Sequence, residues 1–70
     1  MNNKEIVYYL LGAIGDVTRY EAIQALKHYT ELSEQEINNI IDDIIRFNNS
    51  LLQKYREWYI SKTISLISWE

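Results

Sequence analysis

The chain has 70 residues and a formal net charge of -3 at pH 7, and hydrophobic residues make up 47% of it. This length allows one domain, covering residues 1–70, and the hydrophobic fraction is that of a chain that folds around a core. Cysteine is absent, which excludes a disulfide framework and cysteine-ligated zinc. The mildly acidic charge argues against a general attraction to nucleic acid or anionic lipid.

The N-terminal sequence predicts neither export nor membrane insertion. Its longest apolar run, from Ile6 to Leu11, is far shorter than the roughly 20 residues that a membrane span needs. The first five residues also lack the features of a secretory signal peptide. We therefore expect a soluble, cytoplasmic protein with no membrane partner.

Two amphipathic helices are predicted in the first thirty residues. Apolar side chains recur at helical spacing from Ile6 to Ile14, which predicts a helix over about residues 4–14 that ends near Gly15. Thr18, followed three residues later by Glu21, matches a capping box, in which two side chains satisfy free backbone amides at a helix start. A second helix is therefore expected over about residues 19–29.

The third predicted helix has the strongest local signal. Ser33 and Glu36 form another capping box, with apolar residues on either side of it. Five isoleucines then recur at helical spacing, which predicts a helix over about residues 34–47. Because isoleucine is a mediocre helix former, we expect packing against the first two helices to stabilise this segment.

The last twenty residues fit two interpretations. Trp58, Ile60, Ile64 and Leu66 alternate with polar or aromatic residues, which is typical of half-buried strands with a turn near residues 55–57. Helical spacing is also satisfied between residues 51 and 59, and Ser50 with Gln53 would be a further capping box. We prefer strands, because Ser, Thr and Ile dominate the segment from 60 to 68.

This order of elements resembles a winged helix-turn-helix domain over nearly the whole chain. Residues 44–61, IIRFNNSLLQKYREWYIS, are similar to the end of a recognition helix, a turn and two wing strands, with Asn48-Asn49 where the family usually has glycine. The resemblance implies a mainly α (α+β) fold, with three helices and a C-terminal β-hairpin. The alternative is an all-α four-helix bundle.

In that family the third helix enters the major groove of DNA. In this chain, however, the charge of the predicted third helix is unsuitable for that role. Residues 31–43 contain five acidic residues and no basic one, so this surface should repel phosphates. We therefore expect a regulator or adaptor that binds a protein partner through an acidic helix and an aromatic C-terminal region. The predicted protein-binding residues are Glu34, Glu36, Asp42, Asp43 and Trp69.

The alternative is a DNA-binding transcriptional regulator. It would use polar residues of the second and third helices together with two bases of the wing. Its predicted contact residues are Arg19, Asn38, Asn39, Arg46, Lys54 and Arg56.

The sequence lacks the usual combinations of catalytic and ligand-binding residues. His28 is the only histidine, so a histidine-based metal site or catalytic triad has no partners. Asp42 and Asp43 are adjacent, hence about 100° apart around a helix, and do not converge as a catalytic pair would. We expect no enzyme activity, no cofactor and no metal.

Six tyrosines and two tryptophans exceed what so small a core readily hides. We expect Ile64, Leu66, Ile67 and Trp69 to pack onto the domain or across a homodimer interface. A strand over residues 63–68 would also offer a free edge for pairing with another chain.

Overall fold

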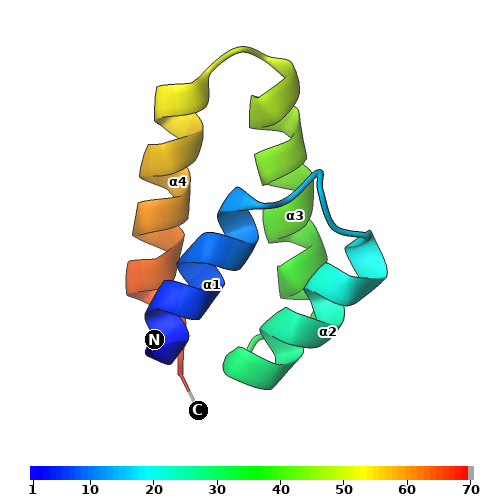
Figure 1. The fold of residues 1–70 in the computed structure, drawn as a ribbon, viewed down its shortest axis with the longest axis vertical. Helices are drawn as coiled ribbons and strands as arrows, with labels where there is room; N and C mark the ends of the chain where they lie inside the picture. Colours follow the sequence, from blue (N-terminus) through cyan, green and yellow to red (C-terminus); the bar gives the residue numbers. More distant parts are fainter. Residues whose placement is uncertain (70) are drawn as a thin grey trace.

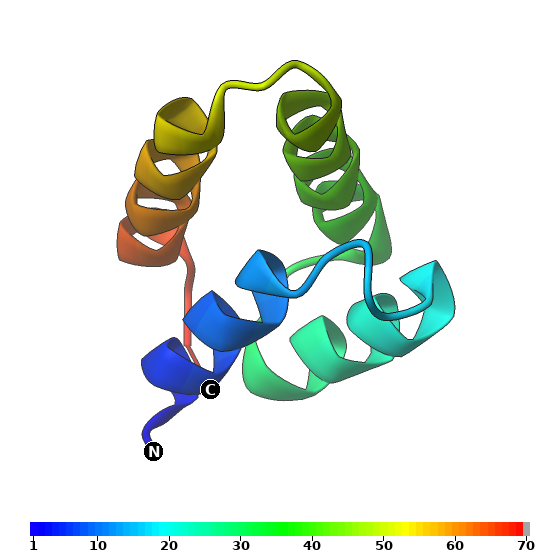
Figure 2. The ribbon, with the colours of Figure 1, turned by 45° about the horizontal axis from the view of Figure 1, so that its top comes forward.

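The structure is a computed structural model that describes residues 1–69, and these residues form four helices and no β-sheet. The helices are α1 (Asn3–Gly12), α2 (Arg19–Tyr29), α3 (Glu34–Asn49) and α4 (Gln53–Leu66), as Figure 1 shows. The two longest, α3 and α4, are joined by a short turn into an antiparallel hairpin (Figures 1 and 2).

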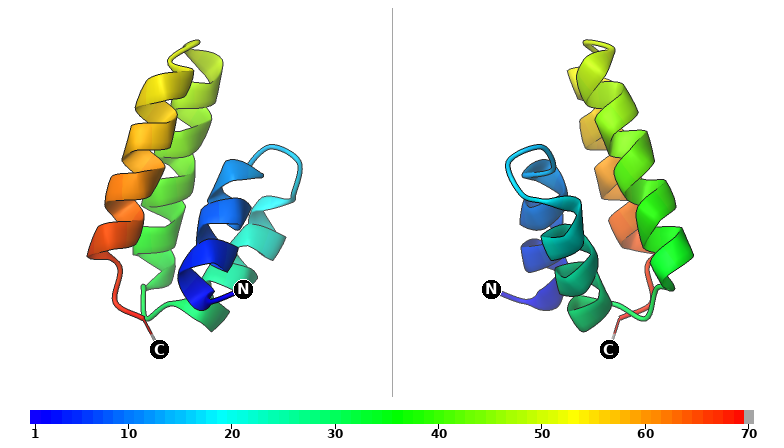
Figure 3. Two further views of the ribbon diagram at one scale, coloured as in Figure 1. Left: turned by 60° about the vertical axis from the view of Figure 1, so that its left-hand side comes forward. Right: turned by 90° about the vertical axis from the view of Figure 1, so that its right-hand side faces the viewer.

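The helices are arranged as two layers of two. In Figure 3, α1 and α2 lie together on one side of the α3–α4 hairpin. Helix α1 packs on α4, α2 packs on α3, and each layer is closed by contacts between its own two helices. The end of the hairpin that contains the α3–α4 turn extends past α1 and α2 (Figure 1).

The core lies between these layers and receives apolar side chains from all four helices. The buried apolar residues are Val7, Leu11, Ile14, Ala22, Ile23, Leu26, Ile37, Ile41, Ile44, Ile60, Ile64 and Ile67. The three from α3 follow the isoleucine pattern, so the predicted inner side of this helix is confirmed, but α3 packs mainly on α2 and α4 and not on the first two helices as expected.

The predicted starts of the first three helices are close to the observed ones. The capping box of α3 is confirmed: Ser33 Oγ accepts from the Glu36 amide at 3.2 Å, and Glu36 Oε1 accepts from the Ser33 amide at 3.2 Å. At α2, Thr18 Oγ1 accepts from the Glu21 amide, but it donates to the Glu21 carboxylate itself at 2.9 Å. The start of α2 is therefore capped, but it lacks the pair of reciprocal side-chain-to-amide hydrogen bonds that makes a full capping box.

The predicted C-terminal β-hairpin is wrong, because residues 53–66 form a single helix. Arg56, Ile60 and Ile64 follow one another at four-residue intervals and are all buried, so helical spacing brings them to one side of α4. Trp58 and Leu66, which the strand pattern placed with Ile60 and Ile64, are exposed. The described residues fit the all-α alternative and not a three-helix winged domain.

The turn between α3 and α4 also differs from the expected one. Ser50 does not cap α4; its hydroxyl donates to the Phe47 carbonyl at 3.0 Å and so helps to end α3. Leu51 has a φ of 63° and its side chain is 94% exposed, and Leu52 precedes α4 without a side-chain cap. A left-handed conformation is uncommon for a residue other than glycine, asparagine or aspartate. The turn therefore holds an apolar side chain in solvent at some conformational cost.

The end of α1 is held by side chains from the hairpin. Arg56 is only 8% exposed, and its Nη2 donates to the Gly12 carbonyl at 2.6 Å. Asn48 Nδ2 donates to the Ile14 carbonyl at 3.3 Å, just before Gly15 turns the chain with a φ of 111°. A cation at a helix C-terminus interacts favourably with the free carbonyls and the helix dipole. Arg56, predicted to contact DNA from a wing, is instead buried against α1.

We predict that Arg56→Ala lowers the free energy of unfolding by about 2 kcal/mol, because the Gly12 carbonyl loses a charge-assisted hydrogen bond and the arginine stem leaves a void. Arg56→Met should cost less than about 1 kcal/mol, since it fills the space and removes a buried charge. Urea unfolding followed by circular dichroism measures both. Equal losses in the two variants would contradict this expectation, because they would show that the hydrogen bond, which both variants lack, matters more than the packing of the arginine stem.

Candidate protein-binding surface

Several aromatic side chains lie together on the outer side of the α3–α4 hairpin. We call this surface the aromatic face, and it consists of Phe47, Tyr55, Trp58, Tyr59, Lys62 and Leu66. The α4 members recur every three or four residues, so they form a stripe along one side of the helix. The exposed fractions are 47% for Tyr55, 51% for Trp58 and 77% for Leu66.

The rings of the aromatic face hold one another in place. Phe47 of α3 meets Tyr55 edge to face with ring centroids 4.5 Å apart, and it meets Tyr59 in the same way at 5.5 Å. Tyr55 and Trp58 lie 5.2 Å apart, and Lys62 Nζ is 4.8 Å from the centre of the Trp58 ring. Such contacts stabilise neighbouring rings beyond their burial. The face is therefore ordered before any partner binds.

A shallow groove of about 320 Å³ runs along α4 in this region. Its lining is mainly apolar and aromatic, with one cation, and it consists of Tyr55, Trp58, Tyr59, Lys62, Thr63 and Leu66. Large aromatic side chains left at a surface are enriched at protein interfaces, where they are the usual anchors.

Tyr59 connects the aromatic face to the acidic side of α3. Its hydroxyl donates to Asp43 Oδ2 at 2.8 Å. Burial of the ring, together with the hydrogen bond and the negative charge of Asp43, raises the pKa of Tyr59 to about 12 from 10.0. The neutral hydroxyl is therefore the form that the folded protein favours.

We predict that Tyr59 ionises later than a free tyrosine when the folded protein is titrated. Because its folded pKa lies above the unfolded value, the unfolded chain loses this proton first, and its contribution to stability is lost as pH rises from about 10 towards 12. Ultraviolet absorbance of tyrosinate measures the titration. In Tyr59→Phe the late step should disappear, and a wild-type titration without a late step would contradict the Asp43 contact.

The four acidic residues predicted to bind a protein all have partners within the chain. Glu34 pairs with Lys27 of α2 at 3.1 Å, and Glu36 is part of the α3 capping box. Asp42 pairs with Arg19 of α2 at 2.6 Å. Asp43 accepts the hydrogen bond from Tyr59 and lies 3.7 Å from Arg46. Three of these carboxylates connect α3 to α2 or α4, Glu36 caps α3 itself, and the structure does not gather the four into one binding site.

The residues predicted to contact DNA are dispersed. Arg19 donates to Asn38 Oδ1 at 2.9 Å as well as to Asp42, and Asn39 Oδ1 accepts from Gln35 at 3.2 Å. Lys54 and Arg46 are exposed, whereas Arg56 is buried. The structure therefore does not bring the six residues to a common surface, and DNA binding stays a prediction from the sequence.

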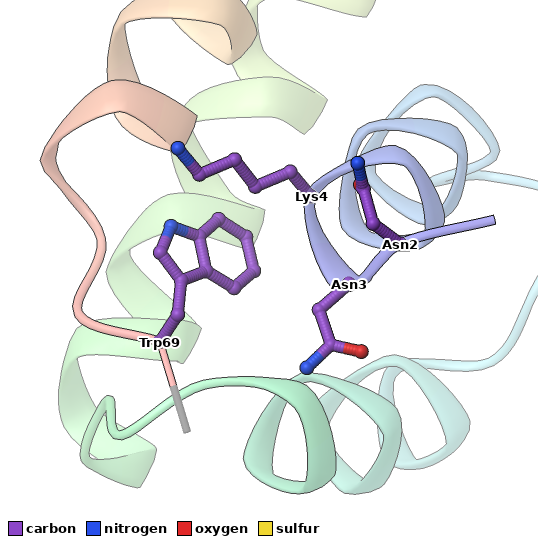
Figure 4. A pocket seen from close by; sticks show the side chains of 4 residues that line it. All are labelled: Asn2, Asn3, Lys4 and Trp69. Atoms are coloured by element: carbon purple, nitrogen blue, oxygen red, sulfur yellow. The ribbon is translucent and has the colours of Figure 1, made fainter.

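Trp69 lies at the opposite end of the molecule from the α3–α4 turn. The segment after α4 runs beside the segment after α2, where the Glu31 amide donates to the Ser68 carbonyl at 3.2 Å and Trp69 pairs with Thr30. Figure 4 shows the indole of Trp69 facing an open hollow beside Asn2, Asn3 and Lys4 at the start of α1. The ring is partly buried against the core.

The expectation that the C-terminal apolar residues pack onto the domain is confirmed for three of them. Ile64 and Ile67 are buried, and Trp69 is half-buried against the core. Leu66 points away from the core and belongs to the aromatic face. The expected free strand edge over residues 63–68 is wrong, because α4 continues to Leu66.

We predict that Trp69→Ala lowers the free energy of unfolding by about 2 kcal/mol, or the Tm by roughly 10 °C for a domain of this size. The reason is that Trp69 packs against the core and pairs with the segment that follows α2. Trp58→Ala is the matched control, and it should cost less than about 1 kcal/mol because half of that side chain is in solvent. Differential scanning calorimetry measures both, and an unchanged Tm in Trp69→Ala would show that the tail is not docked.

Sequence reasoning missed most of the aromatic face. Trp58 and Tyr59 were expected on a strand, Tyr55 was expected in the turn before it, and Phe47 was assigned only to the end of a helix. The signal that could have found the face is the helical spacing of Tyr55, Trp58, Lys62 and Leu66, which continues the alternative helical pattern of residues 51–59.

Within residues 1–69, no helix combines the length and apolar character needed to cross a bilayer. No group of three or more His, Asp or Glu side chains in the described part of the chain is placed to hold a metal ion. Neither a family model, nor a curated protein, nor a solved structure matches the chain.

Proposed function

We propose that this protein is a non-catalytic regulator or adaptor that binds a protein partner through the aromatic face. The observation that carries the proposal is the exposure of Tyr55, Trp58 and Leu66 side by side on one flank of α4. Single exposed apolar residues are ordinary at protein surfaces, but a contiguous group of this kind typically marks an interaction site.

The order of the aromatic face supports binding by a preformed surface. Each exposed ring is held by a neighbouring ring or cation, as the Phe47, Tyr55, Trp58 and Lys62 contacts show. Aromatic side chains have few rotatable bonds, so fixing them on binding costs little conformational entropy. A partner would therefore gain contact area here without first ordering a loop.

The charges around the face favour a protein over a nucleic acid. Asp43 lies directly beside Tyr59, and Glu36 is on the same side of α3, two helical turns away. Phosphates approaching the α3 side of the face would meet these two carboxylates. The acidic residues of α3 are thus better suited to the polar rim of a protein interface than to the centre of a binding site.

A cytoplasmic location is part of the proposal. The chain has no cysteine, so its stability does not depend on an oxidising compartment.

Site-specific photo-crosslinking tests the proposal. We predict that p-benzoylphenylalanine in place of Tyr55 forms covalent protein adducts when the variant is expressed in the cells that carry the natural gene, because Tyr55 is exposed and contacts both Phe47 and Trp58 within the aromatic face. The same substitution at Tyr20 is the control, since that tyrosine is 72% exposed on α2 and outside the face.

Gel electrophoresis and mass spectrometry of the adducts measure the result. Adducts at position 55 that are absent at position 20 would support binding through the aromatic face. Equal labelling at both positions, or none at position 55, would overturn the proposal.

A further inference from the structure

Two rows of opposite charge border the aromatic face. On α3, Glu36 and Asp43 are seven residues apart and share one side of the helix. On α4, Lys54, Trp58 and Lys62 follow one another at four-residue intervals along the outer edge. Neither lysine forms an ion pair within residues 1–69. The hairpin therefore presents an acidic helix and a basic helix, with aromatic rings between them.

We propose that the aromatic face binds a second copy of this chain, a step that rests on the proposed function and names the partner of the same surface. The copies would pack hairpin against hairpin around a two-fold axis, the symmetry that most protein dimers have. The aromatic rings of both copies would then be withdrawn from water, which is the main favourable contribution to association.

The charge pattern selects the direction of the two-fold axis. An axis in the interface and perpendicular to the helices would place α3 on α3, so that Glu36 and Asp43 faced the same acids of the other copy. An axis parallel to the helices places α3 of each copy over α4 of the other. Asp43 of each copy then faces the lysine-bearing side of α4 in the other copy, which is favourable at both symmetry-related contacts.

The positions of the charged residues along the helix axes also agree with a two-fold axis parallel to the helices. Rotation about such an axis does not shift the copies along it, so Asp43 of one copy stays level with Tyr59 of the other, because these two residues are already level within one chain. Lys62 lies one helical turn from Tyr59. The Asp43 and Lys62 side chains of different copies are thus within reach of each other.

The size of the face sets the expected affinity. With 14 residues, α4 is about 21 Å long, and two helices packed about 10 Å apart give a face roughly 20 Å wide. This is small for a specific protein interface. We therefore expect a reversible dimer with a Kd in the micromolar range, on the order of 10 μM, rather than an obligate dimer.

Sedimentation equilibrium of the purified full chain is the first test. The wild type should shift from monomer to dimer as its concentration rises through the micromolar range. Trp58→Glu should stay monomeric, because it places an acid among the rings. Tyr20→Glu should dimerise as the wild type does, and circular dichroism should show that both variants remain folded.

A charge exchange tests the arrangement itself. Lys62→Glu and Asp43→Lys should each raise the Kd about tenfold, whereas the double variant should dimerise nearly as well as the wild type, because each ion pair is restored with its signs reversed. Lys62→Gln removes the cation–π contact and Asp43→Asn keeps an acceptor for the Tyr59 hydroxyl, so each of these variants removes one charge without reversing it. Failure of the double variant to recover would overturn the parallel axis.

The outcomes separate this inference from the proposed function. A wild type that stays monomeric at millimolar concentration would overturn the second copy as partner. Crosslinked adducts at position 55 whose mass is not twice that of the chain would lead to the same conclusion. In both cases binding by the aromatic face would be untouched, since a different protein could occupy it. If no adduct forms at all, the proposed function fails as well.

Discussion

The hydrogen bond from Arg56 to the Gly12 carbonyl joins the last helix to the end of the first, and it goes with one rotation of α4 on which the rest of the molecule depends. With Arg56 turned inward, Ile60 and Ile64 follow at four-residue intervals into the core. The same rotation directs Tyr55, Trp58 and Leu66 outward. The rotation of α4 therefore decides both what the core contains and what the surface offers to a partner.

A buried arginine is an expensive way to join the two helices, because a charge loses its hydration when it leaves water. Here the free carbonyls at the C-terminus of α1, which form the negative end of its helix dipole, partly compensate for the lost hydration. The compensation is incomplete, since Nε of Arg56 has no hydrogen-bond partner among the described residues. An aliphatic residue would pack at the same place with less cost, but it would make no directional contact with α1. Arginine makes that contact, because its guanidinium reaches the Gly12 carbonyl.

The first three helices could be predicted because their signals are local. Ser33 with Glu36 marks the start of α3 within four residues, and the isoleucine spacing identifies its inner side. α4 could not be predicted in the same way, because its core side contains an arginine and its outer side contains apolar rings. Neither side is cleanly polar or apolar, so the helical period is hidden and the alternation of Trp58, Ile60, Ile64 and Leu66 stands out instead. The tertiary contact that explains Arg56 joins residues 44 positions apart, and no local pattern reveals it.

For the candidate site as well, the sequence indicated which types of residue are present but not how the fold arranges them. The sequence indicated an aromatic C-terminal region and an acidic third helix, but not that Arg19 and Lys27 of α2 would pair with Asp42 and Glu34. Those pairs direct one side of α3 toward α2 and leave the opposite side, with Asp43 and Phe47, beside the rings of α4. The acids therefore do two different things according to the side of α3 from which they project. On one side they join the two layers of the fold, and on the other they give the aromatic face a charged border that can distinguish one partner orientation from another.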